Sequence, residues 1–328
     1  MYNQDSKKEY GGFFPLETGH GREFYSDFEN SMLRLNCGRS AIVQAVRDSG
    51  CSKLYIPLYL CISVADALKK NGIEFSFYHI NEEFLPQEVE LKKDEMLLWP
   101  DYYGICAAQA EKLVEKYEPR QLIFDNTQAF FSAPVPQAYN VYSCRKFFGV
   151  ADGAYLIHEG IRKPSLKQDR SAEASLYMLK ALEEGTNAAY ALSKENEQRI
   201  EDSEILEMSP LTRALLCSAD YEKAKQARIS NFSELHSILG SSNGLNITQA
   251  APGIAYPYLR KSDTLRKKLV DSKVYVPQWW KWVAESGEAT PFEEYISEYL
   301  LPIPTDQRYS VSDMMDIVRT ISGNEEIC

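Results

Sequence analysis

Gln121-Leu-Ile-Phe-Asp125-Asn-Thr-Gln128 is the stretch that says most about this chain, and Val141-Tyr-Ser-Cys-Arg-Lys146-Phe-Phe-Gly149 follows it closely. In the first stretch an apolar run ends at a carboxylate. In the second, a short run typical of a strand ends just before a lysine. Asp125 and Lys146 are therefore expected at the carboxyl ends of two strands, where α/β sheets collect their ligands.

The alternation of short apolar runs with helical patterns continues on both sides. Further strands are predicted at 53–57, 74–80, 95–100, 153–158 and 253–259, and helices at 35–48, 63–70, 107–117, within 173–239, at 263–271 and from 312 onward. This order predicts a three-layer α/β/α domain with a mostly parallel sheet and a smaller C-terminal α+β domain. We expect an N-terminal arm at 1–30, a large domain at 31–220 and a small domain at 221–328.

The composition excludes several classes of protein. The net charge of −11 and a pI near 5.1 argue against a general affinity for nucleic acid or anionic membranes. The seven cysteines are scattered and lack a CxxC pair, so we predict buried free thiols rather than disulfides or a zinc site, and the four dispersed histidines suggest no metal site either. The polar N-terminus lacks a signal-peptide pattern, and we expect a cytoplasmic protein.

Asp125 and Lys146 are the two groups that pyridoxal 5'-phosphate (PLP) needs. The lysine amine forms a Schiff base with the aldehyde of the cofactor. A carboxylate beside the pyridine nitrogen keeps that nitrogen protonated, so that the ring withdraws electrons from the substrate carbon. Taken singly, a strand-terminal aspartate is a common turn residue and a lysine is usually a solvated charge. Together they favour a PLP enzyme.

Four segments resemble the DegT/StrS family of PLP-dependent nucleotide-sugar aminotransferases, which have PLP fold type I. They are Asn36–Ile42, Phe124–Ala129, Tyr142–Gly153 and Tyr299–Val318. The resemblance runs from about residue 35 to the C-terminus, and its specific part is 36–157. It implies PLP as the cofactor, small-molecule substrates and a two-fold homodimer, whose partner the arm at 1–30 would reach.

The resemblance also implies a role for each matching position. Lys146 would carry the cofactor and move the proton, Asp125 would pair with the pyridine nitrogen, and Gln128 would lie near the phenolic oxygen. The cofactor phosphate would be bound where a helix begins. The matching positions there are Gly38, Arg39 and Ser40, with Ser143 three residues before the lysine.

The rim of the predicted site departs from the family pattern. Cys61 stands where the family stacks an aromatic ring on the cofactor, so that Tyr59, Tyr102 or Tyr103 provides the ring or the thiol packs against the cofactor. Tyr103 matches a family tyrosine, whereas Tyr102 does not. Ile205-Leu206-Glu207 replaces an Asn-x-Arg motif that reaches the phosphate of the partner subunit.

Two further features have open interpretations. Arg308 lies in a loop where fold-type-I aminotransferases often keep an arginine for a substrate carboxylate, but a surface arginine is at least as good an interpretation. Trp279, Trp280 and Trp282 would either stack on a sugar or base at the substrate entrance or belong to a small-domain core or interface. We favour the second interpretation.

The leading hypothesis is an aminotransferase that moves an amino group from glutamate or another amino acid to a nucleotide-linked keto-sugar. Lys146 supports it, because family members that catalyse dehydration replace this lysine. One alternative is a PLP transaminase or lyase acting on a small amino acid. Another is a catalytically weak PLP-fold protein with a binding or regulatory role, against which the presence of both Asp125 and Lys146 argues.

Overall fold

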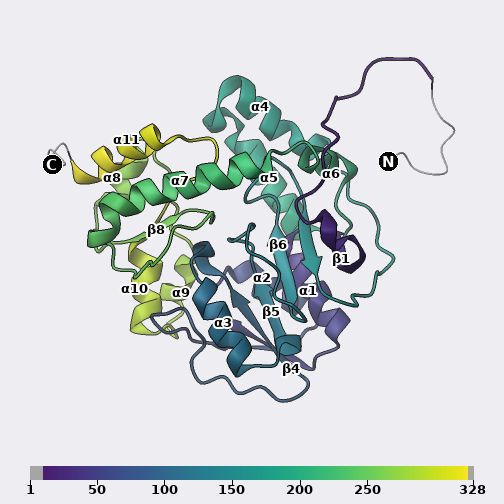
Figure 1. The fold of residues 1–328 in the computed structure, drawn as a ribbon, viewed down its shortest axis with the longest axis horizontal. Coiled ribbons are helices and arrows are strands. Elements are labelled where there is room, and N and C mark those ends of the chain that lie inside the picture. Colours follow the sequence, from purple (N-terminus) through teal and green to yellow (C-terminus); the bar gives the residue numbers. More distant parts are fainter. Residues whose placement is uncertain (1–9, 324–328) are drawn as a thin grey trace.

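The computed structural model of the protein describes residues 10–323. Residues 1–9, which belong to the predicted N-terminal arm, and Cys328 lie outside the described residues. The centre of the structure is a seven-stranded sheet with the strand order β1-β7-β6-β5-β4-β2-β3 (Figure 1). Its strands are β1 Met32–Leu35, β2 Lys53–Pro57, β3 Phe75–Tyr78, β4 Glu95–Pro100, β5 Leu122–Asp125, β6 Tyr139–Ser143 and β7 Ala154–Ile157.

The sheet is mostly parallel, as predicted. Strands β2 to β6 pair in parallel with their neighbours, and β7 runs antiparallel to both β6 and β1. Every residue of β4, β5 and β6 is buried, which is the pattern of strands covered on both faces. The edge strand β1 was not predicted, because it is short and contains Arg34, which forms ion pairs with Glu23 and Glu29.

Helices cover both faces of this sheet. The helices of the first part are α1 Gly38–Ser49, α2 Ile62–Lys70, α3 Ala107–Lys116, α4 Leu176–Glu184, α5 Thr186–Asp202, α6 Pro210–Leu216 and α7 Tyr221–Leu239. Side chains of one strand alternate between the two faces. Leu98 and Ile123 pack in one hydrophobic cluster with α1 and α2, whereas Leu97 and Phe124 pack in a second cluster with Leu113 of α3. This confirms the predicted α/β/α layering.

The chain after α7 contains a second, two-stranded antiparallel sheet of β8 Tyr256–Leu259 and β9 Leu300–Ile303. Its helices are α8 Leu265–Asp271, α9 Lys281–Glu285, α10 Pro291–Tyr299 and α11 Val311–Ser322, and α11 lies along α7 (Figure 1). The predicted strand at 253–259 and the helices at 263–271 and from 312 are present with slightly shorter or shifted bounds. Strand β9 lies within the segment Tyr299–Val318 and was not predicted as a strand. The domain boundary at 220/221 stays a prediction.

Local capping explains where several helices begin. Ser209 accepts a hydrogen bond from the backbone N–H of Thr212 at 3.1 Å, and Pro210 opens α6. Helices α10 and α11 each begin with a capping box. Short 3₁₀ helices connect other elements: η1 Ser26–Ser31, η2 Tyr102–Gly104, η3 Pro119–Gln121, η4 Glu173–Ser175 and η5 Gly240–Ser242.

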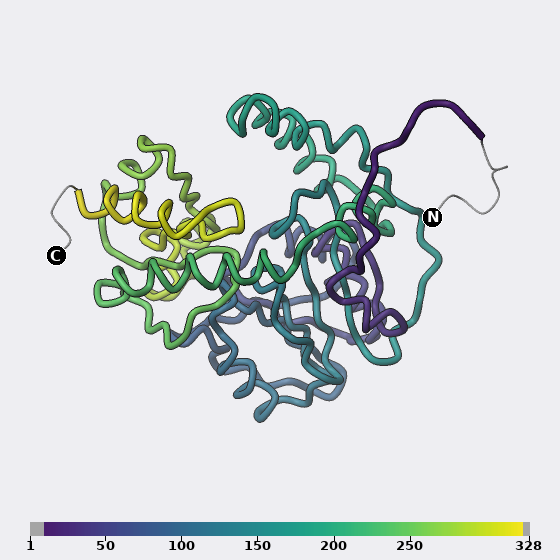
Figure 2. The backbone as a smooth tube through the Cα atoms, turned by 45° about the horizontal axis from the view of Figure 1, so that its top comes forward, coloured from purple at the N-terminus to yellow at the C-terminus, as the bar shows by residue number. Residues whose placement is uncertain are grey.

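The described part of the arm is an extended segment that passes α6 (Figure 2). The backbone N–H of Gly19 donates to Ser218 Oγ at 2.6 Å. Before this contact, Phe13 and Phe14 are 92% and 93% exposed. Their exposure agrees with an arm whose rings are not covered by this chain, while contact with a partner subunit stays a prediction.

Other features of the sequence have these outcomes. Within residues 10–323 all cysteines are free, but only Cys37, Cys106 and Cys144 are buried, so the expectation that all of the thiols are buried was wrong for Cys61, which is exposed. Over the same residues, no group of three or more histidine, cysteine or acidic side chains is arranged to hold a metal ion. No helix in this range is long and apolar enough to cross a membrane.

Candidate active site

Asp125 and Lys146 are brought together by two neighbouring parallel strands. Asp125 is the last residue of β5 and pairs with Val141 of β6, and Lys146 follows the end of β6 by three residues. The Lys146 amine donates to Thr127 Oγ1 at 3.1 Å, and the Thr127 backbone N–H donates to Asp125 Oδ1 at 3.0 Å. Thr127 therefore links the amine and the carboxylate, and Asp125 is only 4% exposed.

The Lys146 side chain opens into a cavity of about 710 Å³. Its accessible surface faces this cavity, but the surrounding protein still removes much of the water around the amine. This desolvation lowers the pKa of Lys146, Asp125 and the Cys61 thiol act to raise it, and Arg145 and Arg39 lower it further. A lysine with a lowered pKa has more neutral amine near pH 7, which is the form that attacks an aldehyde.

We expect Arg145→Met to raise the pKa of Lys146, because Arg145 lowers that pKa and a higher pKa favours the charged amine. At a fixed pH below this pKa, the variant would react more slowly with an aldehyde. Labelling of Lys146 by an amine reagent is followed by mass spectrometry as a function of pH. The pH at which labelling is half-maximal, the labelling midpoint, reports the pKa of Lys146. Arg120→Met removes an exposed arginine in η3 and should leave the midpoint unchanged. A midpoint for Arg145→Met at or below that of the unsubstituted protein would contradict the assignment.

The start of α1 lies against the same residues. Gly38 is the first residue of this helix, and a Cβ atom there would meet Thr127 Cγ2 at 3.0 Å. Cys37 and Ser40 contact each other through Sγ and Oγ at 3.3 Å. The first backbone N–H groups of a helix lack partners within the helix and favour an anion. The predicted phosphate position at Gly38 is therefore adjacent to Thr127, the residue that links Asp125 and Lys146.

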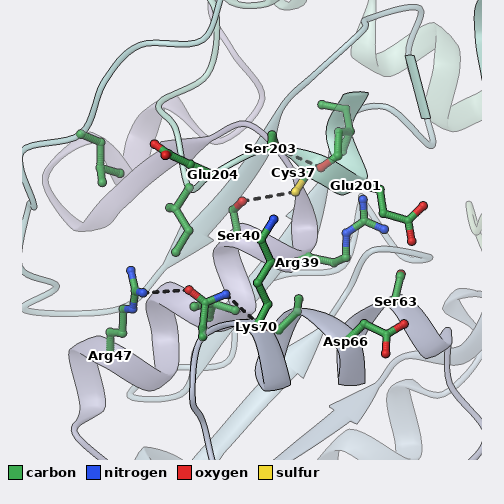
Figure 3. Close-up of a pocket in the computed structure, with 16 residues that line it drawn as sticks. Cys37, Arg39, Ser40, Arg47, Ser63, Asp66, Lys70, Glu201, Ser203 and Glu204 are labelled. Carbon is green, nitrogen blue, oxygen red and sulfur yellow. Dashed lines mark hydrogen bonds between the residues drawn. The ribbon is translucent and has the colours of Figure 1, made fainter. Parts of the chain in front are cut away.

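A second cavity, of about 400 Å³, lies beside this helix start (Figure 3). Arg39 and Ser40 line it together with Ser63 of α2, and Glu201 of α5 lies on its wall. These two predicted phosphate ligands thus face a cavity of mixed charge rather than the cavity that holds Lys146. The charge of Arg39 still contributes to the lowered pKa of Lys146. A phosphate role for Arg39 and Ser40 stays a prediction, as it does for Ser143, which is buried at the end of β6.

We predict that Gly38→Ala destabilises the protein by about 1–3 kcal/mol, because the new methyl group crowds Thr127 Cγ2. Thr127→Ser removes that carbon and keeps the hydroxyl that Lys146 contacts. The double variant Gly38→Ala/Thr127→Ser should therefore recover most of the lost free energy of unfolding. Urea unfolding of the four proteins measures the coupling, and strictly additive effects would show that the two positions do not meet.

The aromatic residues expected at the rim are packed away from the cavities. Tyr59, Tyr102 and Tyr103 are at most 1% exposed. The Tyr103 ring stacks on Trp279 with centroids 5.5 Å apart, and the Tyr59 ring meets Trp280 edge to face at 4.5 Å. The Tyr102 hydroxyl donates to the Tyr59 carbonyl, and their roles in binding cofactor or substrate stay predictions. The tryptophans themselves lie at the contact between the C-terminal part and the large sheet, the interpretation that we favoured.

Gln128 and Cys61 have defined neighbours in the structure, while their roles towards the cofactor stay predictions. Gln128 is 4% exposed, and its Oε1 accepts a hydrogen bond from the Tyr103 backbone N–H at 2.9 Å. Cys61 precedes α2, its thiol contacts Ser63 Oγ at 3.0 Å, and it lies near enough to Lys146 to influence its pKa. Cys61 is exposed, and its contact with the cofactor stays a prediction.

The remaining rim residues are arranged as follows. Arg308 lines the cavity that holds Lys146 and forms a forked ion pair with Asp306, at 2.7 and 2.9 Å. The Ile205-Leu206-Glu207 segment is held within the chain, since the Asn36 N–H donates to the Leu206 carbonyl at 2.9 Å and Glu207 forms a β-bridge with Leu35.

Sequence reasoning missed Thr127, Arg228 and Gln307, all of which lie around Lys146. Thr127 was inside a quoted motif, and its hydroxyl was the available signal. Arg228 of α7 and Gln307 both bind the Phe147 carbonyl, next to Lys146 in the chain. A charged residue in a helix normally indicates a solvated face, so the sequence carried no signal for Arg228.

No protein-family model matches the chain, and no curated protein matches it. Solved structures do match. The aminotransferase TlmJ from Streptoalloteichus hindustanus shares 17% identity at a TM-score of 0.60, over 92% of this chain and 90% of that chain. An aminotransferase of the DegT, DnrJ, EryC1 and StrS type from Brucella abortus shares 13% identity at 0.58, over 91% and 87%.

A third structure is that of the enzyme ColD, a GDP-4-keto-6-deoxymannose-3-dehydratase with bound GDP-perosamine. It shares 11% identity at a TM-score of 0.62, over 90% of each chain. At these identities the likeness establishes the fold, and the predicted fold type I is confirmed. Because aminotransferases and a dehydratase share this fold, the reaction must be inferred from the residues of the site.

The residues of the site fit PLP. Gly38 lets the start of α1 approach Thr127 closely, and the first N–H groups of that helix favour an anion such as a phosphate. Lys146 supplies an amine with a lowered pKa beside an open cavity. Asp125 supplies a buried carboxylate that accepts a hydrogen bond from Thr127 and has no cationic side chain in an ion pair with it among the described residues. A protonated pyridine nitrogen is the partner that such a carboxylate lacks.

Proposed function

We propose that this chain is a PLP-dependent aminotransferase that moves an amino group from an amino acid, with glutamate as the first candidate, to a nucleotide-linked keto-sugar. The observation that carries the proposal is the linked arrangement of Lys146, Thr127 and Asp125 at the ends of β5 and β6. The fold shared with ColD, which is solved with bound GDP-perosamine, supports a nucleotide-linked keto-sugar as acceptor.

Each residue has a stated task in this proposal. When bound, PLP would supply an electron-withdrawing ring that stabilises negative charge on the substrate carbon. Lys146 would hold the cofactor through its Nζ and afterwards carry the proton between the two carbon atoms that exchange it. Asp125 would keep the pyridine nitrogen protonated, and the start of α1 at Gly38 would bind the phosphate.

The same proposal includes a homodimer in the cytoplasm. The acidic chain and the absence of a spanning helix within residues 10–323 agree with it. The aromatic side chains of Phe13 and Phe14 are exposed and available to a second copy. Sedimentation of the full chain tests this part, and a monomer at all concentrations would contradict it.

The test is the visible absorption of the purified protein with PLP, before and after glutamate. We expect an absorption band of the lysine-bound cofactor that glutamate removes, with release of one 2-oxoglutarate per site. D-Glutamate is the matched control and should leave the band in place. A band that no amino acid removes would contradict aminotransfer, and a protein without any such band would favour a binding or regulatory role.

A further inference from the structure

Arg228 is a buried cation with no acidic partner. It lies on α7, is 2% exposed and forms no ion pair with any carboxylate of residues 10–323. Its guanidinium donates through Nη1 to the Gly253 carbonyl at 2.8 Å, through Nε to Gln307 Oε1 at 3.0 Å and through Nη2 to the Phe147 carbonyl at 3.4 Å. It also lies 4.4 Å from the centre of the Phe147 ring.

Burial of this charge has a cost. Desolvation lowers the pKa of Arg228 to about 10, with Asp306 opposing the change and Arg308 adding to it. A methionine of similar length would occupy the same space without desolvating a charge. An apolar residue could fill the same space, but it could not make the hydrogen bonds of the guanidinium. These hydrogen bonds are therefore what arginine adds at this position.

One of these contacts holds the Phe147 carbonyl, one residue after Lys146. The Phe147 carbonyl accepts hydrogen bonds from Arg228 Nη2 and from Gln307 Nε2, the latter at 2.7 Å. Arg228 and Gln307 are also bonded to each other. The turn that carries Lys146 is thus held by one donor from α7 and one from the segment between β9 and α11.

A second contact fixes the opposite flank of the site. The Gly253 carbonyl accepts from Arg228, and the backbone of Gly253 lies so close to Tyr103 that a Cβ at 253 would be 1.7 Å from the Tyr103 carbonyl oxygen. The adjoining Ile254 N–H donates to the Gln128 carbonyl at 3.0 Å. One guanidinium therefore connects the Lys146 turn with the segment that supports Tyr103 and Gln128.

We infer that Arg228 is a positioning residue for Lys146: it holds the Lys146 turn and the segment at Gly253 at a fixed separation, so that the amine is kept in the cavity between them. The expected effect of Arg228 on the reaction rate rests on the proposed function. The expected effect on the position and pKa of the Lys146 amine does not. Without Arg228 the turn gains freedom, more water surrounds the Lys146 amine, and the effect of desolvation on its pKa weakens.

The experiment compares Arg228→Met and Arg228→Lys with Arg266→Met. Arg266 is a matched control, because it also donates to backbone carbonyls, at 2.7 Å to Val276 and 2.9 Å to Leu300, and has no carboxylate partner among residues 10–323. The pH midpoint of Lys146 labelling is measured by mass spectrometry on the protein without PLP, and unfolding is followed in parallel. We expect Arg228→Met to raise the midpoint, Arg228→Lys to recover part of the change and Arg266→Met to leave it unchanged.

In the PLP-loaded protein, misplacement of the amine should lower the rate of amino transfer by about 10²-fold for Arg228→Met. If the unsubstituted protein does not take up PLP, the proposed function fails, while the labelling still tests Arg228. An unchanged labelling midpoint in Arg228→Met, or an equal rise in Arg266→Met, would overturn the inference.

If Arg228→Met does not fold, Gln307→Ala provides a second test. Gln307 is half-buried, and the substitution removes the other donor to the Phe147 carbonyl. Gln307→Ala should raise the labelling midpoint less than Arg228→Met does. If it causes no rise, the inference is also overturned.

Discussion

Lys146→Ala should abolish the absorption band of lysine-bound PLP and lower amino transfer by at least about 10²–10⁴-fold, the usual contribution of a positioned proton-transfer group. The substitution removes the amine that opens into the cavity and that donates to Thr127. Absorption spectra and single-turnover rates with glutamate measure the effect. The free energy of unfolding should change little. The substitution removes the hydrogen bond to Thr127, but it also removes the cost of partly desolvating the amine.

Lys146→Arg is the control for charge. It keeps a cation next to Asp125 and a donor within reach of Thr127, but a guanidinium does not condense with an aldehyde at neutral pH. We expect it to lose the band as completely as the alanine variant does. If Lys146→Arg retained a normal band, another lysine would hold the cofactor and the assignment would be wrong.

Asp125→Asn should lower the rate of amino transfer by about 10²–10³-fold, which is about 3–4 kcal/mol of activation free energy at about 1.36 kcal/mol per tenfold. The amide keeps the shape of the side chain, and its oxygen still accepts the hydrogen bond of the Thr127 N–H. It does not keep a proton on the pyridine nitrogen. The variant should therefore bind PLP and show a band but turn over slowly, which single-turnover kinetics would separate from weak binding.

Asp101→Asn is a matched control for this variant. Asp101 comes directly after β4, just as Asp125 is the last residue of the neighbouring strand β5. Asp101 is 5% exposed and accepts hydrogen bonds from the Cys106 N–H and the Ser132 hydroxyl. Burial raises its pKa to about 6. We expect Asp101→Asn to keep the rate within a few-fold of the unsubstituted protein. Equal losses in the two variants would show that a general disturbance of the strand ends, and not the pyridine contact, slows the reaction.

The centre of the fold could be predicted from the sequence because its strands are buried on both faces. The apolar runs of β4 and β5 lead to Asp101 and Asp125, and the predicted bounds of β4 agree with the structure. The edge strands gave weaker signals. In β1 the presence of Arg34 hides the pattern, and in β9 the proline at 302 resembles a turn signal.

The site was predictable only where its residues follow one another along the chain. Asp125 and Lys146 stand at strand ends within quoted motifs, so their neighbourhood followed from the parallel pairing of β5 and β6. Arg228 and Gln307 reach the site from 81 and 160 residues away in the chain, and no local pattern indicates such a contact. The burial of Tyr59 and Tyr103 likewise depends on Trp280 and Trp279, which come from a distant segment.

The placement of the tryptophans makes the protein its own fluorescent reporter. Trp99 is buried within β4 at 1% exposure, whereas Trp279 stacks on Tyr103 and Trp280 meets Tyr59 edge to face. Trp282 Nε1 donates to the Leu60 carbonyl at 2.8 Å. A shift of the C-terminal part relative to the sheet would change the surroundings of the last three indoles and leave the first as a constant background. Emission wavelength would thus follow that movement during turnover without any attached dye.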